Sequence, residues 1–205
     1  MQLMIPSPSL PSIFGPHRVS IPRFISLLSA LLLLAVANTR AQRAPNPTFL
    51  NQIYYYWADS LLPCPKMDGQ MESKAKAMGF GGSQMAYTMD GDRSPLRIRS
   101  ADTLRFAVKP GGGGMMDPST MYKLYKFESK KGGRQAVISN QSRFGGNNEP
   151  KNQVSIDVQK SGTDVFILIP SGRLAPGEYG FMNMMSVSTN GMKMSYTFYT
   201  FGVDQ

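Results

Sequence analysis

Apolar and polar residues alternate with a period of two along much of the chain after residue 82. Residues 104–108 and 154–158 place an apolar side chain at every second position, which is the pattern of strands that bury one face. Residues 165–169 are apolar throughout and indicate a central strand covered on both faces. The predicted strands include Ser83–Tyr87, Leu96–Ile98, Leu104–Val108, Met121–Glu128, Arg134–Ser139, Val154–Val158, Val165–Ile169 and Met192–Val203.

Turn-forming residues separate these segments at short intervals. Asp-Gly, Gly-Gly and Asn-Gly pairs stand at residues 90–91, 132–133 and 190–191. Short strands divided by turns about every eight to twelve residues are typical of β-sandwiches. We therefore predict an all-β protein, with an immunoglobulin-like antiparallel β-sandwich of about eight or nine strands over residues 83–205.

Residues 42–82 are predicted as an N-terminal segment that is partly irregular or forms a short helix. Asn51–Leu62 is rich in aromatic and aliphatic residues and is compatible with either a strand or a short helix. Met71–Met78 could form two turns of helix, which would be marginal in isolation.

The stretch Leu174–Phe181 (Leu-Ala-Pro-Gly-Glu-Tyr-Gly-Phe) combines a turn with the start of a strand. In immunoglobulin-type sandwiches, a tyrosine just after such a corner donates its hydroxyl to the upstream backbone. Pro176, Gly177 and Tyr179 are therefore predicted to be structural residues, with Tyr179 as a buried anchor.

Methionines cluster near the C-terminal end, between residues 182 and 194. If Asn190-Gly191 is a two-residue turn, Val187 lies opposite Met194, and strand alternation defines one apolar face. That face comprises Tyr179, Phe181, Met185, Val187, Thr189, Met192, Met194, Tyr196 and Phe198. We predict that most of these methionines fill the core. Met182 and Met184 fall on the opposite face and support an alternative, a copper-handling protein with soft thioether ligands.

Residues 1–41 are predicted to be a signal peptide with a long n-region. Arg18 and Arg23 precede the apolar run Phe24–Ala37, and Thr39-Arg40-Ala41 leads into Gln42. The apolar run is too short to span a bilayer. We expect cleavage after Ala41, no transmembrane segment in the mature protein, and export to the periplasm, the outer surface or the extracellular space.

Composition excludes several kinds of site. The single histidine, His17, lies in the predicted signal peptide, so Ser-His-Asp catalysis, Cys-His catalysis and histidine-ligated zinc are not expected. The single cysteine, Cys64, is predicted to be an inert loop thiol. Removing Arg18, Arg23 and Arg40 with the signal peptide lowers the formal net charge from +9 to +6, a moderate excess.

Four basic residues, Arg97, Arg99, Arg105 and Lys109, are predicted to share the exposed face of two neighbouring strands. Such a stripe could bind an anionic polysaccharide, lipid head groups or nucleic acid, although we favour the simpler interpretation of a solvated sheet face. Nucleic acid is disfavoured because no aromatic residues are interleaved with the charges.

Tyr55 and Trp57 are a second candidate for ligand binding, since aromatic rings stack on carbohydrates. The alternative is an aromatic segment that packs against the sandwich. Among the 13 acidic residues, nothing selects a catalytic pair, so a carboxylate-based hydrolase acting on carbohydrate remains an alternative without named residues. No catalytic residue, metal ligand or cofactor is predicted.

Several stretches together resemble a group of uncharacterised exported β-sandwich proteins from Bacteroidota-type bacteria. They are Ala41-Gln42, Ser94–Ile98, Asp117-Pro118 with Tyr122-Lys123-Leu124, Leu174–Phe181 and Phe198–Asp204. The resemblance covers residues 83–204 and implies a fold and a compartment, without an activity. We expect an exported, non-catalytic binding or structural module whose partner is an anionic glycan, a cell-envelope component or a protein.

Overall fold

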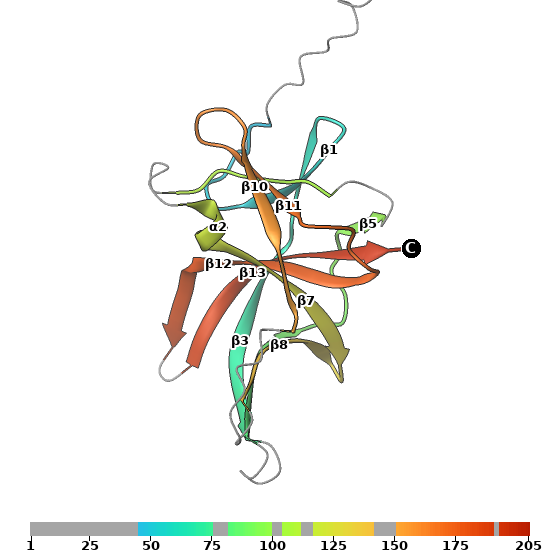
Figure 1. Cartoon of the computed structure of the whole chain (residues 1–205), viewed down its shortest axis with the longest axis vertical. Coiled ribbons are helices and arrows are strands. Elements are labelled where there is room, and N and C mark those ends of the chain that lie inside the picture. The colour runs from blue at the N-terminus through green and yellow to red at the C-terminus, as the bar shows by residue number, and fades with distance from the viewer. Residues whose placement is uncertain (1–44, 76–81, 100–103, 112–116, 142–150, 191–192) are drawn as a thin grey trace, which may run out of the picture. The chain divides into compact units, whose positions relative to one another are not determined.

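The computed structural model describes residues 45–75, 82–99, 104–111, 117–141, 151–190 and 193–205. Contacts divide the chain into two units, Met1–Gln42 and Arg43–Gln205, and the described residues all belong to the second. They form strands and one short helix, which confirms the all-β class (Figure 1). In this described part, no helix is both long and apolar enough to cross a membrane.

The strands are β1 (Ile53–Trp57), β2 (Ser60–Pro63), β3 (Lys66–Ala75), β4 (Ser83–Asp90), β5 (Arg97–Arg99), β6 (Phe106–Val108), β7 (Tyr122–Lys130), β8 (Gly133–Gln141), β9 (Gln153–Val154), β10 (Ile156–Lys160), β11 (Phe166–Pro170), β12 (Gly177–Asn190) and β13 (Lys193–Asp204). The helix α2 (Pro118–Met121) begins after Asp117, whose carboxylate accepts a hydrogen bond from the Ser119 N–H at 2.8 Å.

The strands form two sheets. The smaller sheet has the order β10-β11-β6-β1-β2, and the larger has the order β12-β13-β3-β4-β8-β7-β9, with β5 parallel to β13. In addition, Glu178–Asn183 of β12 pairs with β7, which closes β3, β4, β8, β7, β12 and β13 into a ring. An immunoglobulin-like sandwich consists of two open sheets, so its connectivity is not confirmed by these pairings.

The apolar core has two main parts, because β7, β12 and β13 bury both of their faces. One cluster lies between these strands and the smaller sheet and contains Ile53, Phe106, Leu168, Phe181 and Phe201. The other cluster lies inside the ring, where Tyr87 of β4 contacts Tyr125 of β7 and Phe198 of β13, with ring centroids 5.3 and 5.4 Å apart. Edge-to-face aromatic pairs therefore fill the ring.

The N-terminal segment is more regular than predicted. Residues 53–75 form three strands, and β3 lies in the ring between β13 and β4. The predicted helix at Met71–Met78 is wrong for residues 71–75, which are part of β3, and residues 76–78 lie outside the described part. Ala58 and Asp59 join β1 to β2 with φ of 46° and 64°. This left-handed pair forms a tight hairpin without the glycine that usually marks one.

Two local predictions hold and one does not. The β7–β8 hairpin and the central position of β11, between β10 and β6, are confirmed. The alternation over residues 104–108 is wrong, because Phe106, Ala107 and Val108 are all fully buried. The reason is that β6 lies inside the smaller sheet, which carries apolar clusters on both faces.

The corner at Leu174–Phe181 is confirmed. The Tyr179 hydroxyl donates to the Ala175 carbonyl at 2.7 Å, and the side chain is 2% exposed. Its ring stacks on that of Phe201, with centroids 5.6 Å apart. Tyr179 therefore anchors the start of β12 to the chain that precedes it.

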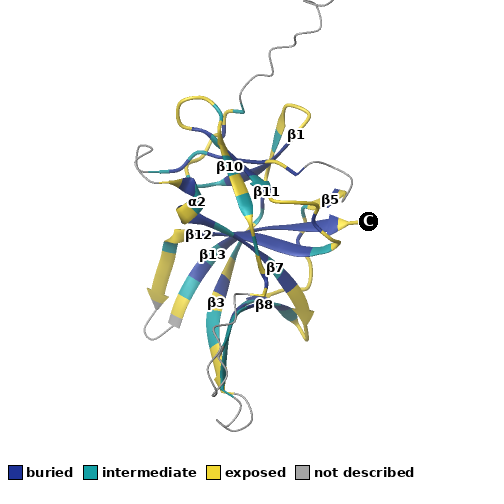
Figure 2. Ribbon diagram, viewed as in Figure 1, coloured by how far each residue is buried: buried dark blue, intermediate teal, exposed yellow. Residues whose placement is uncertain are grey.

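The β12–β13 hairpin differs from the predicted pairing. Val187 lies opposite Tyr196 instead of Met194, and between Met182 and Val187 four residues of β12 face Thr197 alone. This bulge changes which face the side chains after Met182 occupy. Met182 itself lies on the face predicted to be polar but is fully buried, because that face of β12 covers the ring core. The expected core residues Met185, Val187 and Met194 are 61%, 43% and 46% exposed. Figure 2 shows this outer half of β12 as exposed, so the prediction that these methionines fill the core is wrong.

Cys64 lies between β2 and β3 and is 1% exposed. Burial raises the pKa of the thiol well above its usual range. The thiolate, which is the reactive form, is therefore disfavoured, in agreement with the prediction of an inert loop thiol.

Candidate functional site

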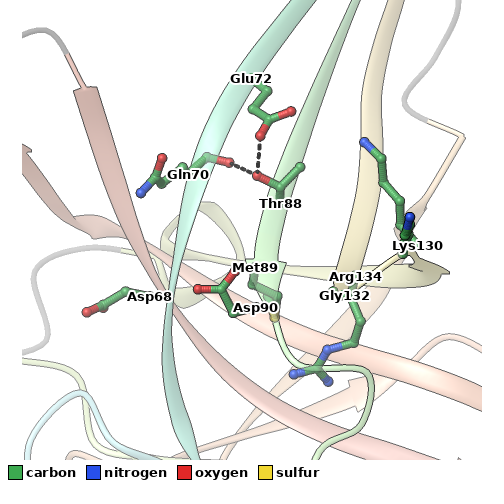
Figure 3. Close-up of a pocket in the computed structure, with 11 residues that line it drawn as sticks. Asp68, Gln70, Glu72, Thr88, Met89, Asp90, Lys130, Gly132 and Arg134 are labelled. Atoms are coloured by element: carbon green, nitrogen blue, oxygen red, sulfur yellow. Dashed lines mark hydrogen bonds between the residues drawn. The ribbon is translucent and has the colours of Figure 1, made fainter.

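A polar pocket of about 250 Å³ lies over β3, β4 and β8, beside the β7–β8 turn (Figure 3). It is lined by Asp68, Gln70, Glu72, Thr88, Met89, Asp90, Lys130, Lys131, Gly132, Gly133 and Arg134. Asp68, Gln70 and Glu72 stand at alternate positions of β3, opposite in direction to Met67 and Met71, which pack against the ring core. The pocket is therefore on the outer face of the ring.

Small residues leave the space for this pocket. Gly133, which lines the pocket, lies across from Asp90, and Ala86, across from Glu72, lines a neighbouring hollow. A Cβ on Gly133 would be only 2.5 Å from the Met89 carbonyl oxygen, so no larger residue fits there without movement of the backbone. A second hollow of about 240 Å³ shares Glu72 and Lys130 and extends the surface toward Gln84 and Gln135.

Hydrogen bonds and charges fix Glu72 in the pocket wall. Thr88 Oγ1 donates to Glu72 Oε1 at 3.2 Å, and Lys74 Nζ lies 2.9 Å from Glu72 Oε2. The hydrogen bond from Lys74 is the main reason that the pKa of Glu72 is lowered, and Thr88 contributes in the same direction. The ammonium of Lys74 also lowers the pKa of Lys130, because like charges so close disfavour a second proton.

The electrostatics of Glu72 disfavour this residue as a general acid. A general acid that works near neutral pH needs a raised pKa, and the pKa of Glu72 moves in the opposite direction. Carboxylates accept hydrogen bonds, ammonium groups donate them, and amides do both. A hydroxyl-rich ligand can therefore be held by the polar side chains of Asp68, Gln70, Glu72, Asp90 and Lys130.

A buried charge network lies next to the pocket and has a structural role. Arg134 Nη1 is 2.9 Å from Glu178 Oε2, and the exposed fractions of the two side chains are 0% and 11%. The Ser94 N–H donates to the same oxygen at 2.7 Å. Arg97 pairs with both Glu178 and Asp204. Burial lowers the pKa of Arg134, and Glu178 opposes that shift.

Gly202 makes room for this network. A Cβ at Gly202 would collide with the guanidinium of Arg97, which passes over the β13 backbone to reach Glu178. Glu178 follows the Pro-Gly corner, whereas Gly202 and Asp204 belong to the Phe-Gly-Val-Asp ending. The two motifs singled out in the sequence are therefore joined by Arg97 in the folded protein.

The predicted basic stripe does not assemble. Arg97 and Arg99 lie on β5 in the larger sheet, whereas Arg105 and Lys109 flank β6 in the smaller sheet. The prediction that they share a face of two neighbouring strands is wrong, because β5 pairs with β13 and β6 pairs with β1 and β11. Arg97 is also held by the two carboxylates of the network.

The predicted aromatic site of Tyr55 and Trp57 does not form either, because the two side chains differ in exposure. Tyr55 is buried and packs on Phe106 with ring centroids 5.8 Å apart, whereas Trp57 is 56% exposed at the end of β1. Stacking of a sugar on both rings is therefore excluded by the burial of Tyr55. Stacking on Trp57 alone stays a prediction.

Sequence reasoning missed Arg134, Glu178 and the pocket residues. One signal was present, because Arg134 shares its alternation with Ala136 and Ile138. A charged residue on an otherwise apolar face indicates a buried ion pair. The pocket carried no such signal, since it depends on the pairing of β3, β4 and β8.

Comparisons with protein-family models, with curated proteins and with solved structures gave no match to this chain. The functional assignment therefore rests on the geometry of the described residues.

Proposed function

We propose that the protein is an exported, non-catalytic binding module that holds a neutral, hydroxyl-rich glycan in the polar pocket. The observation that carries the proposal is the set of carboxylates, amide and ammonium around a 250 Å³ pocket on a sheet face outside the core. Export is supported by the signal-peptide pattern of residues 1–41 and by the resemblance to exported Bacteroidota-type proteins.

The pocket favours a neutral ligand over the anionic one considered from the sequence. The carboxylates of Asp68, Glu72 and Asp90 offset the positive charge of the pocket lysines, so no net positive charge selects an anion there. The basic residues expected to attract an anion lie on different sheets. The nearby lysines balance these carboxylates, so groups of both signs are available to hydroxyl oxygens and hydrogens.

A carboxylate-based hydrolase is the second candidate, because Asp68 of β3 and Asp90 of β4 share the pocket. Glycoside hydrolysis requires one carboxyl group that keeps its proton, and Glu72 does not fulfil that requirement. Turnover of a bound glycan would favour the hydrolase.

The binding module is tested on a glycan array, followed by titration calorimetry with each positive glycan. Asp68→Asn and Lys130→Ala alter the pocket, and Asp157→Asn and Lys160→Ala are matched controls on β10 in the other sheet. A hydrogen bond to a charged group contributes about 1.5–3 kcal/mol, so each pocket variant should bind about tenfold or more weakly. Equal affinity in pocket and control variants would refute the proposal.

A further inference from the structure

The outer half of the β12–β13 hairpin exposes methionines that serve neither the core nor the polar pocket. Met184, Met185 and Met194 are 42%, 61% and 46% exposed. Figure 2 shows the outer half of β12 as exposed. An exposed thioether is available as a ligand, and a half-buried one such as that of Met71 keeps part of its surface accessible.

Two of the sulfurs near this hairpin converge on one point. Ser195 of β13 pairs with Gln70 of β3, so Met194 and Met71 occupy adjoining positions on neighbouring strands. The hydroxyl oxygen of Tyr196 lies 3.5 Å from Met194 Sδ and 4.0 Å from Met71 Sδ. Tyr196 is 8% exposed and holds this meeting point in place.

We propose that Met71 and Met194 bind a soft monovalent metal ion, Cu(I) or its surrogate Ag(I), between their two thioether sulfurs. Thioethers are soft ligands that select Cu(I) over harder ions. The methionine side chain has three rotatable bonds, so the two sulfurs can close on an ion without movement of the strands.

Clusters of His, Cys, Asp and Glu within the described residues do not account for such binding. No group of three or more His, Cys, Asp or Glu side chains in this part of the chain is placed to hold a metal. Cys64 is buried as a thiol and is separated from solvent. Binding of a soft ion by the protein should therefore depend on its thioether sulfurs.

The test is a competition in which the purified full chain removes Cu(I) from a coloured chelator under anaerobic conditions. Ag(I) is titrated in parallel into protein carrying ¹³C-labelled methionine methyl groups. We expect the methyl resonances of Met71 and Met194 to shift together and to saturate at one ion per chain. Even outer partners of a metal contribute 10–100-fold to affinity, so Met71→Leu and Met194→Leu should each weaken binding by at least about tenfold.

Met185→Leu is the matched control, because Met185 is exposed on the same hairpin but is not expected to be a ligand. Its affinity should equal that of the unaltered protein. The proposal is overturned if the chain fails to compete at micromolar metal, or if the Met71→Leu/Met194→Leu double variant binds as tightly as the unaltered chain. A loss of binding in Met185→Leu alone would also overturn the pairing of Met71 with Met194.

Discussion

Replacing Glu178 by glutamine would leave the guanidinium of Arg134 inside the protein without a carboxylate partner. Arg134 Nη1 lies 2.9 Å from Glu178 Oε2, and the Arg134 side chain is 0% exposed. Among the described residues, its Nη2 contacts a weak acceptor, Met67 Sδ, at 2.9 Å, and its Nε has no hydrogen-bond partner. Glu178 is therefore the main compensation for this buried charge.

The expected cost follows from this burial. Removing one partner of a buried ion pair costs about 3–5 kcal/mol, because the remaining charge stays desolvated. Glutamine keeps one acceptor oxygen for Arg134 or for the Ser94 N–H, so we expect the lower end, about 3 kcal/mol. With a denaturant slope of about 2 kcal/mol per molar urea, the unfolding midpoint should fall by about 1.5 M.

Equilibrium urea unfolding, followed by circular dichroism and by tryptophan fluorescence, measures this change. Glu128→Gln is the matched control, since Glu128 is exposed on β7 and should change stability by no more than about 0.5 kcal/mol. The double variant Glu178→Gln/Arg134→Met should regain part of the loss, because it leaves no buried charge unpaired. If Glu178→Gln changed the urea midpoint as little as Glu128→Gln, solvent would have to reach Arg134. That result would contradict the burial of the Arg134–Glu178 ion pair.

Three further substitutions test the same region. Tyr179→Phe removes the hydrogen bond to the Ala175 carbonyl and should lower the free energy of unfolding by about 1 kcal/mol; an unchanged urea midpoint would contradict the anchor. Gly202→Ala displaces the Arg97 guanidinium, so it should lower the free energy of unfolding by as much as Arg97→Ala does. If the two losses were additive in the double variant, the two substitutions would be acting on separate interactions. The hydrogen bond from Arg97 lowers the pKa of Asp204 from its ordinary value of 3.8. The resulting stabilisation is complete well above pH 3.8 and is lost as the pH falls through the lower pKa of the folded protein. Acidification below about pH 4 should therefore destabilise the Asp204→Asn variant less than it destabilises the unaltered protein. Parallel stability curves would argue against the Arg97–Asp204 pair.

Local patterns predicted those elements whose partners are close in the chain. The β7–β8 hairpin follows from two apolar segments joined through Gly132 and Gly133. The buried Tyr179 follows from the Pro-Gly corner just before it, since the hydroxyl reaches only four residues back. In both cases the deciding contacts are short-range, so the sequence contains the information in one stretch.

The β12–β13 hairpin shows where local sequence patterns no longer predict which side chains are buried. Alternation predicted one continuous apolar face from Tyr179 to Val187, and it would have been correct for an unbroken strand. Met182 precedes the bulge and points into the ring, because β12 is covered on both faces there. The bulge then inserts extra residues into β12, and Met185 and Val187 beyond Met182 are exposed. No residue type in this stretch marks the bulge, and its position depends on how β12 pairs with β13 and β7.

The sequence by itself determined the all-β class, most of the strands after residue 82 and the tyrosine corner. Only the tertiary structure decided that β12 pairs with β7 and closes a ring, that Arg97 links the Pro-Gly corner to the Phe-Gly-Val-Asp ending, and that β3, β4 and β8 form a polar pocket. The physical reason is that alternation fixes which side chains share a face of one strand, whereas the choice of neighbouring strands depends on long-range packing.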